Sequence, residues 1–526
     1  MPPPPPRRHA APMPNTVELT VPPGHWARDT DHQTGPMVPL WASVWCESYT
    51  RGFAEAFARW GYLGDGLVAV PIGGWCYVGF RPLADPGLVP VRIARAAQAA
   101  ADDEHLHAAR DWAEVTGPGF ERQLRRLATG AGPGRLEGAV RLVREVVRAR
   151  FATTCGVQEL VVEWVLQAGE RLGWSPERAL ALAAGPPRVV AELRGVLQAV
   201  QACPALAARL DRGESPALDE LRADPGVAAA LAAHLDRRGD TLLQVDLAGP
   251  TLAERPEHLA GAVAAAWSPY RRPPADRSAE EALLDADLRA ALERARIAHP
   301  QRDDGGDLLT RCLGLLRRAA LEAGAQLGLP APSDALLLTA DELVQAQRRG
   351  RVDPEPVELR RAAHGHAGAQ PPPATVGDPP GPRPDPSGLP APAARAMQRL
   401  GASVALMSGP PVPGVPAPDG PDLVAGVPAS AGRYAGVVRV ARTVEEAHAL
   451  EPGEVLVCPV TAPAWNLAMG RAGALVCDVG GQLSHAAITA RELGVPAVVG
   501  CRTATAELRT GDRVVVDGAA GSVRRA

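Results

Sequence analysis

The stretch from residue 477 to residue 500 reads CDVGGQLSHAAITARELGVPAVVG, and it decides the fold of the C-terminal part of the chain. Its first residues are typical of the end of a β-strand. Gly480 and Gly481 follow, and the freedom of glycine at positive φ lets the backbone turn sharply there. Ser484 is placed to cap a helix, because its hydroxyl accepts a hydrogen bond from an unpaired backbone N–H of the first turn. The pattern predicts a strand, a glycine turn and a helix that begins at His485.

His485 has the surroundings that a phosphate carrier needs. An imidazole on the first turn of a helix points outward, while free backbone N–H groups and the helix dipole stabilise an anion beside it. A neutral imidazole nitrogen is also a competent nucleophile toward phosphorus. Gly494 ends the predicted helix and Pro496 prevents its resumption. None of the other eleven histidines has comparable surroundings.

Strands and short helices alternate on both sides of this stretch. The expected strands cover residues 436–441, 454–459, 473–478, 497–499 and 513–517, and the expected helices cover residues 443–450, 464–471 and 485–493. This alternation predicts a compact α/β domain of about 100 residues over 424–526.

The same residues closely resemble the mobile phosphohistidine domain of the phosphoenolpyruvate-utilising enzymes, a family that includes pyruvate phosphate dikinase, phosphoenolpyruvate synthase and rifampicin phosphotransferase. The matching segments are 430–432, 436–438, 461–465, 480–481, 484–488, 490–494, 496–500, 511–512 and 517–518. The resemblance implies a swivelling β/β/α fold in which His485 carries the phosphoryl group, supported by Gly480, Gly481, Ser484 and Arg491. Dikinase members commonly place threonine two residues before the histidine, and Leu483 at that position argues against dikinase-style regulation.

An aromatic cluster marks the beginning of the globular part of the chain. More than half of all the aromatic residues fall between residues 26 and 80. Six of them, Trp41, Trp45, Tyr49, Phe53, Phe57 and Trp60, recur every three or four residues and predict one face of a helix. Two short apolar runs around Gly73 and Gly74 predict a hairpin. The cluster could line an apolar acceptor pocket, but packing of the helix against the hairpin explains it at least as well.

The chain from 25 to 366 is predicted to be a large, mainly α-helical domain, because apolar positions recur with a helical period and are interrupted by helix-stop signals. Ser175 before Pro176, and the capping box from Thr339 to Glu342, are helix starts. This region resembles the substrate domain of rifampicin-phosphotransferase-like proteins. The predicted architecture is therefore a mainly helical substrate-binding domain followed by the phosphohistidine domain.

Two segments have the composition of tethers. Residues 1–24 are proline-rich and are expected to be disordered, since they cannot bury enough apolar surface to offset their ordering entropy. Residues 367–423, rich in proline and glycine, are predicted to form a semi-rigid linker with a short helix near 393–400. Such a linker could be a simple tether or the arm on which a mobile domain turns, and the C-terminal motif favours the arm.

Composition excludes several function classes. The net charge of −4 provides no broad basic field for nucleic acid. All 55 basic residues are arginine, so sites that depend on a lysine ammonium, such as a Walker-type phosphate loop or a pyridoxal Schiff base, are excluded. The eight cysteines have no metal-ligand spacing, and no apolar stretch approaches the ~20 residues of a membrane span. A cytoplasmic protein with no bound metal and no membrane partner is expected.

These observations predict a phosphotransferase component. His485 would carry a phosphoryl group from a separate ATP-grasp protein, which would bind Mg²⁺ and ATP (or phosphoenolpyruvate), to a small organic hydroxyl compound. A separate donor is expected because the resemblance includes no ATP-grasp domain and no phosphoenolpyruvate-binding barrel. Two alternatives stay open: a binding or regulatory protein without turnover, and a carrier that passes the phosphoryl group to another protein.

Overall fold

The structure is a computed structural model of the chain. It describes residues 21–29, 33, 35–130, 132, 134–185, 187–243, 245–272, 276–369, 372–379, 388–408, 422–447, 449–461 and 465–526. Most of the segment predicted to be disordered, residues 1–24, lies outside these described residues.

Three long helices form the centre of the N-terminal region: α1 (Pro39–Trp60), α5 (Gly134–Leu172) and α14 (Gln301–Gln326). The aromatic stripe of α1 packs into this core, where Trp41, Trp45 and Trp60 are at most 1% exposed. The helix is confirmed, and core packing, rather than a ligand pocket, explains the aromatic stripe. Gly156 lets α1 and α5 approach closely, because a Cβ there would lie 2.2 Å from the Trp60 ring.

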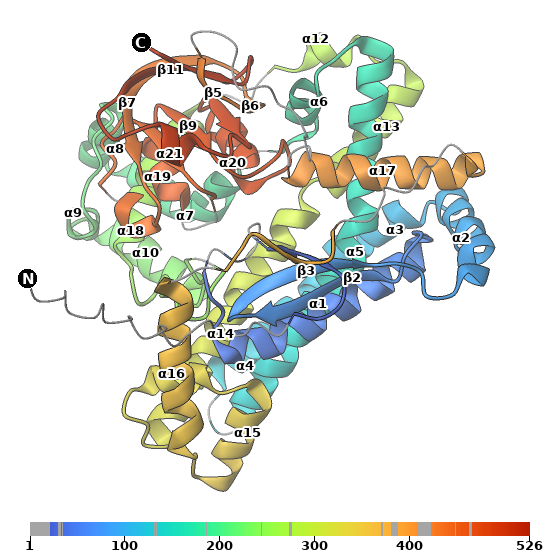
Figure 1. Cartoon of the computed structure of the whole chain (residues 1–526). Coiled ribbons are helices and arrows are strands. Elements are labelled where there is room, and N and C mark those ends of the chain that lie inside the picture. The colour runs from blue at the N-terminus through green and yellow to red at the C-terminus, as the bar shows by residue number, and fades with distance from the viewer. Residues whose placement is uncertain are drawn as a thin grey trace, which may run out of the picture.

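A small antiparallel sheet covers α1, and its hairpin is drawn in blue in Figure 1. Strands β2 (Gly66–Ile72) and β3 (Trp75–Arg81) form the predicted hairpin. Gly73 and Gly74 both have positive φ, 57° and 82°, as a two-residue hairpin turn requires. Strand β1 (His25–Arg28) pairs with β3 and with β4 (Thr375–Gly377), so part of the segment predicted as linker joins this sheet.

Shorter helices, of which those between residues 188 and 271 form a second apolar core of their own, complete the helical region. They are α2 (Val89–Ala101), α3 (Glu104–Asp111), η2 (Trp112–Thr116), α4 (Gly117–Thr129), α6 (Pro176–Ala183), α7 (Arg188–Ala202), α8 (Pro204–Asp211), α9 (Leu218–Arg222), α10 (Pro225–Arg238), α11 (His258–Arg271), α12 (Ser278–Glu281), α13 (Ala286–Ala298), α15 (Ala340–Arg349) and α16 (Pro354–Ala369), with 3-10 turns η1 (Pro86–Leu88) and η3 (Pro332–Leu337). The predicted helix starts are confirmed: Ser175 caps α6, and Thr339 with Glu342 forms the capping box of α15.

The C-terminal domain is built on an eight-stranded mixed sheet in the order β5-β12-β11-β7-β8-β9-β10-β6. Its strands are β5 (Asp422–Ala425), β6 (Val427–Ser430), β7 (Arg433–Val440), β8 (Val455–Cys458), β9 (Ala474–Cys477), β10 (Ala497–Val499), β11 (Arg513–Asp517) and β12 (Ser522–Arg525). Its helices are α18 (Val444–Ala447), α19 (Asn466–Arg471), α20 (His485–Leu493) and α21 (Ala504–Glu507). The four strands from β7 to β10 run parallel, and the remaining pairs are antiparallel.

The predicted fold class is confirmed: a large, mainly helical region precedes a C-terminal domain with a mixed sheet. All five predicted strands of this domain form. Sequence reasoning missed β5, β6 and β12, which are edge-side strands of only four residues each. Strands β8, β9 and β10 are equally short, but each is a continuous run of buried apolar residues, whereas β5, β6 and β12 each include charged, proline or serine residues that weaken the strand pattern.

Two contacts seat the C-terminal domain on the helical region. Helix α11 packs against α19, where a Cβ at Gly470 would lie 1.9 Å from the Ala265 side chain, so only glycine permits this approach. Helix α17 (Ala391–Ser408) is drawn in orange across α5 in Figure 1. Its C-terminal end contacts the C-terminal domain, where the Leu406 carbonyl oxygen accepts a hydrogen bond from the Leu483 N–H. The helix predicted near 393–400 therefore forms and is longer than predicted.

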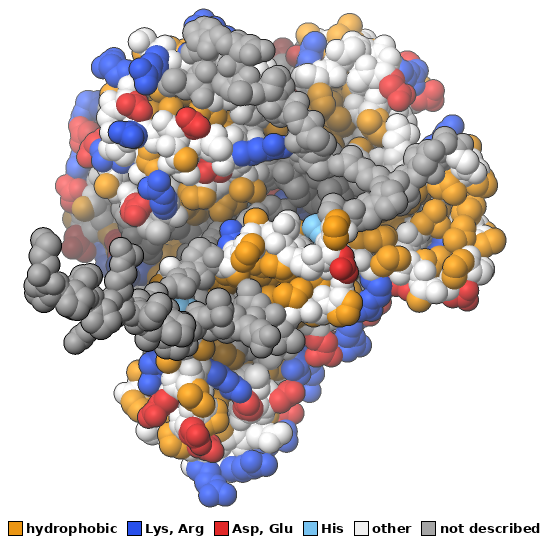
Figure 2. All heavy atoms as spheres, viewed as in Figure 1, with side chains coloured by type: hydrophobic (Ala, Val, Ile, Leu, Met, Phe, Trp, Pro, Cys, Tyr) orange, Lys and Arg blue, Asp and Glu red, His pale blue; other side chains and the backbone are white. Residues whose placement is uncertain are grey.

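The surface shows no dominant charge on the side in view. On the described part of the face in Figure 2, arginine side chains are interspersed with aspartate and glutamate. Among the described residues, no helix has the length and apolar character needed to cross a membrane.

Candidate functional site

The turn before α20 fixes where His485 stands. Gly480 has φ 126°, as predicted, whereas Gly481 is not in the positive-φ region and instead accepts a hydrogen bond through its carbonyl from the Ser484 N–H (3.0 Å). The Ser484 hydroxyl accepts from the Ala487 N–H at 3.3 Å and caps the helix. The backbone N–H groups of His485 and Ala486 make no hydrogen bond with the described residues. The predicted helix start thus has two donors available for an anion.

Two threonines flank the imidazole of His485. Thr461 Oγ1 lies 3.0 Å from Nδ1, a normal hydrogen-bond distance, while Thr489 Oγ1 lies 3.4 Å from Nε2. Thr461 follows β8, and His485 follows the neighbouring strand β9 and its turn. The carboxyl ends of adjacent parallel strands meet at one edge of a sheet, which brings these side chains together. Nδ1 is therefore held firmly, and Nε2 is the less engaged nitrogen.

The first turn of α14 faces the imidazole from the helical region. Burial lowers the pKa of His485 to about 4; the carboxylate of Asp303 opposes this shift and the guanidinium of Arg302 reinforces it. The imidazole is consequently neutral at pH 7, the form in which its nitrogen has a lone pair for phosphorus. His485 lies at the boundary between the C-terminal domain and the helical region, which is called the seam below. Its electrostatic neighbours Asp303 and Arg302 belong to the helical region.

We expect the His485 ring to stay neutral as the pH falls from 7 to 5 and to gain a proton only near pH 4. Because the folded pKa lies below the ordinary value of about 6.5, the unfolded chain binds this proton more readily. His485 therefore contributes stability above that ordinary pKa and loses it as the pH falls toward 4. Ring-¹⁵N chemical shifts across the titration, assigned with a His485→Gln variant, measure this directly; protonation near pH 6.5 would contradict it.

Arg491 braces the loop that carries His485. Its guanidinium donates to the carbonyl oxygen of Ala429 at 2.8 Å and to the carbonyl oxygen of Gln482. Burial lowers the pKa of Arg491 to about 10, against the opposing charges of Glu177, Glu492 and Asp303, so the group stays charged at pH 7. The structure thus gives Arg491 a positioning contact, and its predicted contact with a phosphoryl group stays a prediction.

Leu483 anchors the same loop on the helical region. Its side chain is 1% exposed and belongs to the main core cluster of the helical region, where Leu400 and Leu406 of α17 also pack. Its N–H donates to the Leu406 carbonyl oxygen at 2.6 Å. A threonine would bring a hydroxyl into this apolar contact, at a desolvation cost that leucine avoids. The departure from the dikinase pattern at this position therefore has a packing role here.

The far end of α20 also contacts the helical region. Glu492 Oε2 accepts from the backbone N–H of Arg188 at the start of α7 (3.2 Å). Burial raises the pKa of Glu492 to about 7, and Asp303 reinforces the shift. The C-terminal end of α20 is thus bound to the start of α7, and Asp303 in the first turn of α14 acts electrostatically on both ends of α20.

Sequence reasoning identified His485, Gly480, Gly481, Ser484 and Arg491, and all of them meet at this turn. It did not assign a role to Thr461, although the end of a strand parallel to β9 was a usable signal. Arg302 and Asp303 lie about 180 positions earlier in the chain and carry no local signal. Among the described residues, no group of three or more His, Cys, Asp and Glu side chains is arranged to hold a metal ion.

Comparison with known proteins places this site in a recognised domain. Residues 450–521 match the family described as PEP-utilising enzyme, mobile domain. The chain is 49% identical over 98 residues to an uncharacterised phosphotransferase YvkC of Bacillus subtilis, and 54% identical over 107 residues to a phosphoenolpyruvate synthase of Aeropyrum pernix. These matches cover 19% and 20% of this chain but only 12% and 13% of the relatives. The C-terminal part of the chain is therefore similar to the mobile domain of PEP-utilising enzymes.

Proposed function

We propose that this chain is the phosphoryl-carrying component of a phosphotransferase, with His485 as the carrier. The observation that carries the proposal is a neutral imidazole with Nδ1 bound to Thr461, at the start of a capped helix whose first two N–H groups are available. The match of residues 450–521 to a mobile domain of PEP-utilising enzymes supports the same role.

The proposed chemistry has two displacement steps. In loading, the Nε2 lone pair attacks the donor phosphorus, a P–N bond forms and the bond to the leaving oxygen breaks. The phosphorylated ring then loses its one proton, from Nδ1, to that oxygen or to solvent. In transfer, an acceptor hydroxyl oxygen attacks the same phosphorus and the P–N bond breaks. The hydroxyl proton ends on the imidazole, which is neutral again. Before loading, Thr461 accepts from Nδ1–H and so leaves the Nε2 lone pair available to attack phosphorus.

The donor and acceptor belong to the proposal as well. A separate ATP-grasp protein would supply the phosphoryl group from ATP or phosphoenolpyruvate and would hold the Mg²⁺ that such transfers use. The acceptor would be a small organic hydroxyl compound bound by the helical region, whose α14 already meets His485 across the seam.

Labelling of the purified chain tests the proposal. The chain is incubated with ATP labelled at the β or γ phosphorus, or with labelled phosphoenolpyruvate, with and without a candidate ATP-grasp protein. Trypsin releases residues 472–491, a peptide in which His485 is the only histidine. We expect partner-dependent label on this peptide that is lost in acid and retained in alkali, as for a P–N bond.

Other results would contradict the proposal. Acid-stable label, or label on another peptide, would mean that His485 is not the carrier. No label with any donor would favour a binding or regulatory role. Label that passes to a protein but never to a small molecule would favour a protein-to-protein carrier.

A further inference from the structure

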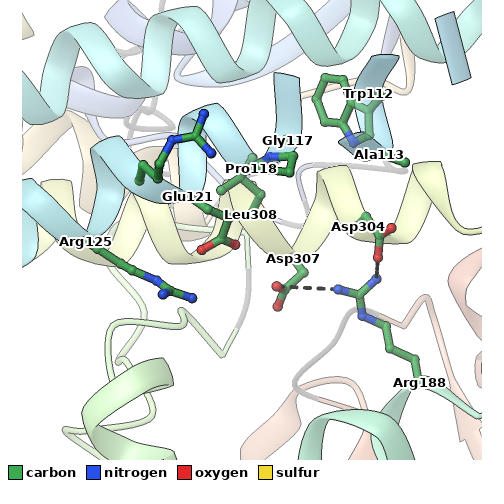
Figure 3. Close-up of a pocket in the computed structure, with 11 residues that line it drawn as sticks. Trp112, Ala113, Gly117, Pro118, Glu121, Arg125, Arg188, Asp304, Asp307 and Leu308 are labelled. Atoms are coloured by element: carbon green, nitrogen blue, oxygen red, sulfur yellow. Dashed lines mark hydrogen bonds and ion pairs between the residues drawn. The ribbon is translucent and has the colours of Figure 1, made fainter. Parts of the chain in front are cut away.

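A pocket of about 430 Å³ opens beside the seam, between η2, α4, α14 and the start of α7. Figure 3 shows Trp112 and Pro118 on one side of it and the side chain of Arg188 reaching across from the other. The volume lies in the range of small-molecule sites, which combine apolar walls with a few polar groups. The sequence did not point to this pocket, because its walls come from three separate segments.

The acidic side chains of the pocket are already neutralised. Asp304 and Asp307 both pair with Arg188, at 2.7 Å and 3.4 Å, as the dashed lines in Figure 3 mark. Glu121 accepts from Arg311 at 2.9 Å. These acids therefore offer little net charge to a ligand.

Two arginines of the pocket have no such partner. The guanidinium groups of Arg122 and Arg125, both on exposed positions of α4, make no ion pair or hydrogen bond with the described residues. They lie one turn apart on the same helix, so both can reach one anion. Arginine presents a planar fork of donors that matches a carboxylate or phosphate. The uncompensated charge of the pocket is positive and is concentrated at this rim.

The backbone at the pocket wall is irregular. Residues Trp112–Thr116 form a π-helical turn between α3 and α4, and Trp112 and Ala113 from this turn line the pocket. A π-helical turn is rare, because its hydrogen bonds are less favourable than those of an α-helix, and it occurs often at functional sites. Here it is an observation independent of the charge pattern that also indicates a ligand site.

The pocket is adjacent to the environment of His485. Asp303 is an electrostatic neighbour of the imidazole, and the next residue, Asp304, lines the pocket. Arg188 lines the pocket with its side chain, while its backbone N–H binds Glu492 on the helix that His485 begins. The first turn of α14 and the start of α7 are thus shared by the pocket and the carrier site.

We infer that this pocket binds the phosphoryl acceptor and that the acceptor is an anionic hydroxy compound, a small aromatic hydroxy-carboxylate in its simplest form. Its carboxylate would meet Arg122 and Arg125, and its ring would lie along Trp112 and Pro118. That the ligand is the phosphoryl acceptor rests on the proposed function. The anion site itself rests only on the residues of the pocket.

The site is tested by measuring the binding of 4-hydroxyphenylacetate to the unphosphorylated full chain with ligand-detected NMR. Tyramine, which carries an ammonium in place of the carboxylate, is the comparison ligand. We expect 4-hydroxyphenylacetate to bind, and the double variant Arg122→Gln/Arg125→Gln to weaken it at least about tenfold, the effect of losing a charge-assisted hydrogen bond. Arg126→Gln, on an exposed position of the same helix outside the pocket, is the matched control and should bind like the wild type.

Three results would overturn the inference: no binding of 4-hydroxyphenylacetate, equal binding of tyramine, or equal loss in the Arg126→Gln control. The measurement needs no phosphoryl donor, and His485→Ala should bind the ligand like the wild type. If the wild-type chain shows arginine-dependent binding but no donor labels it, the anion site stands and the carrier function is rejected. Labelling of His485 without arginine-dependent binding would support the carrier function and reject the anion site.

Discussion

Replacement of His485 by alanine is expected to abolish the acid-labile label on the tryptic peptide 472–491, to less than about a thousandth of the wild-type rate. The expectation follows from the geometry, because among the described residues at this turn only His485 presents a nitrogen nucleophile to a donor. Thr461 and Thr489 flank the ring, but when His485 is replaced their hydroxyl groups lose the imidazole that is their neighbouring base. The initial rate of label incorporation, with partner and donor in excess, is the measurement.

Controls separate loss of the nucleophile from loss of the fold. His485→Gln keeps a polar side chain of similar reach and should be equally inactive, because an amide nitrogen has no lone pair available for phosphorus. His107→Ala, at an exposed position of α3, should incorporate label like the wild type. Residual acid-labile label in both His485 variants would show that another histidine is the carrier.

The turn before His485 could be predicted from the sequence because its determinants are local. Gly480, the Ser484 cap and the Gly494 C-cap each act within a few residues, and the structure places α20 at the predicted residues 485–493. Gly481 is the exception, since its φ is not positive and its role lies in its carbonyl group. Local hydrogen-bonding chemistry is thus well encoded in a short stretch of sequence.

The surroundings of that turn could not be predicted, because they depend on contacts between distant segments. Nothing in residues 367–423 indicated that β4 would join the N-terminal sheet or that α17 would lie along α5, since proline-rich composition predicts a tether. The electrostatic effect of Asp303 on the pKa of His485 likewise arises only when the C-terminal domain is packed on the helical region. The domain limits at 366 and 423 stay a prediction.

A second large effect is expected at Glu159, where α17 is fastened to α5. Glu159 is 3% exposed; its Oε1 accepts from the Tyr62 hydroxyl and its Oε2 accepts from Arg399 Nε at 2.7 Å. Burial raises the pKa of Glu159, and the charge of Arg399 and the Tyr62 hydrogen bond oppose the shift. His105 Nε2 is 3.7 Å from Oε2, but burial lowers the pKa of His105 to about 3, so this neighbour is neutral and adds no ion pair.

Glu159→Ala should therefore destabilise the helical region by about 3–5 kcal/mol, because it leaves the Arg399 guanidinium and the Tyr62 hydroxyl without their acceptor in a buried site. Tryptophan fluorescence in a urea titration reports this region, since nine of the ten tryptophans precede residue 270. The expected result is a shift of the first unfolding transition to lower urea. In a chain of several domains this transition is compared between variants rather than converted to one global free energy.

Glu163 provides the matched control, because it lies one turn further along α5 and contacts the same arginine. Arg399 Nη1 is 3.4 Å from Glu163 Oε2, and the Glu163 side chain is 40% exposed. A solvent-exposed pair contributes little, so Glu163→Ala should cost less than about 1 kcal/mol. Equal effects of the two variants would show that burial of Glu159 is not what fastens α17. Because the Leu406 carbonyl at the end of α17 binds the Leu483 N–H, a loosened α17 should also raise hydrogen exchange at Leu483, two residues before His485.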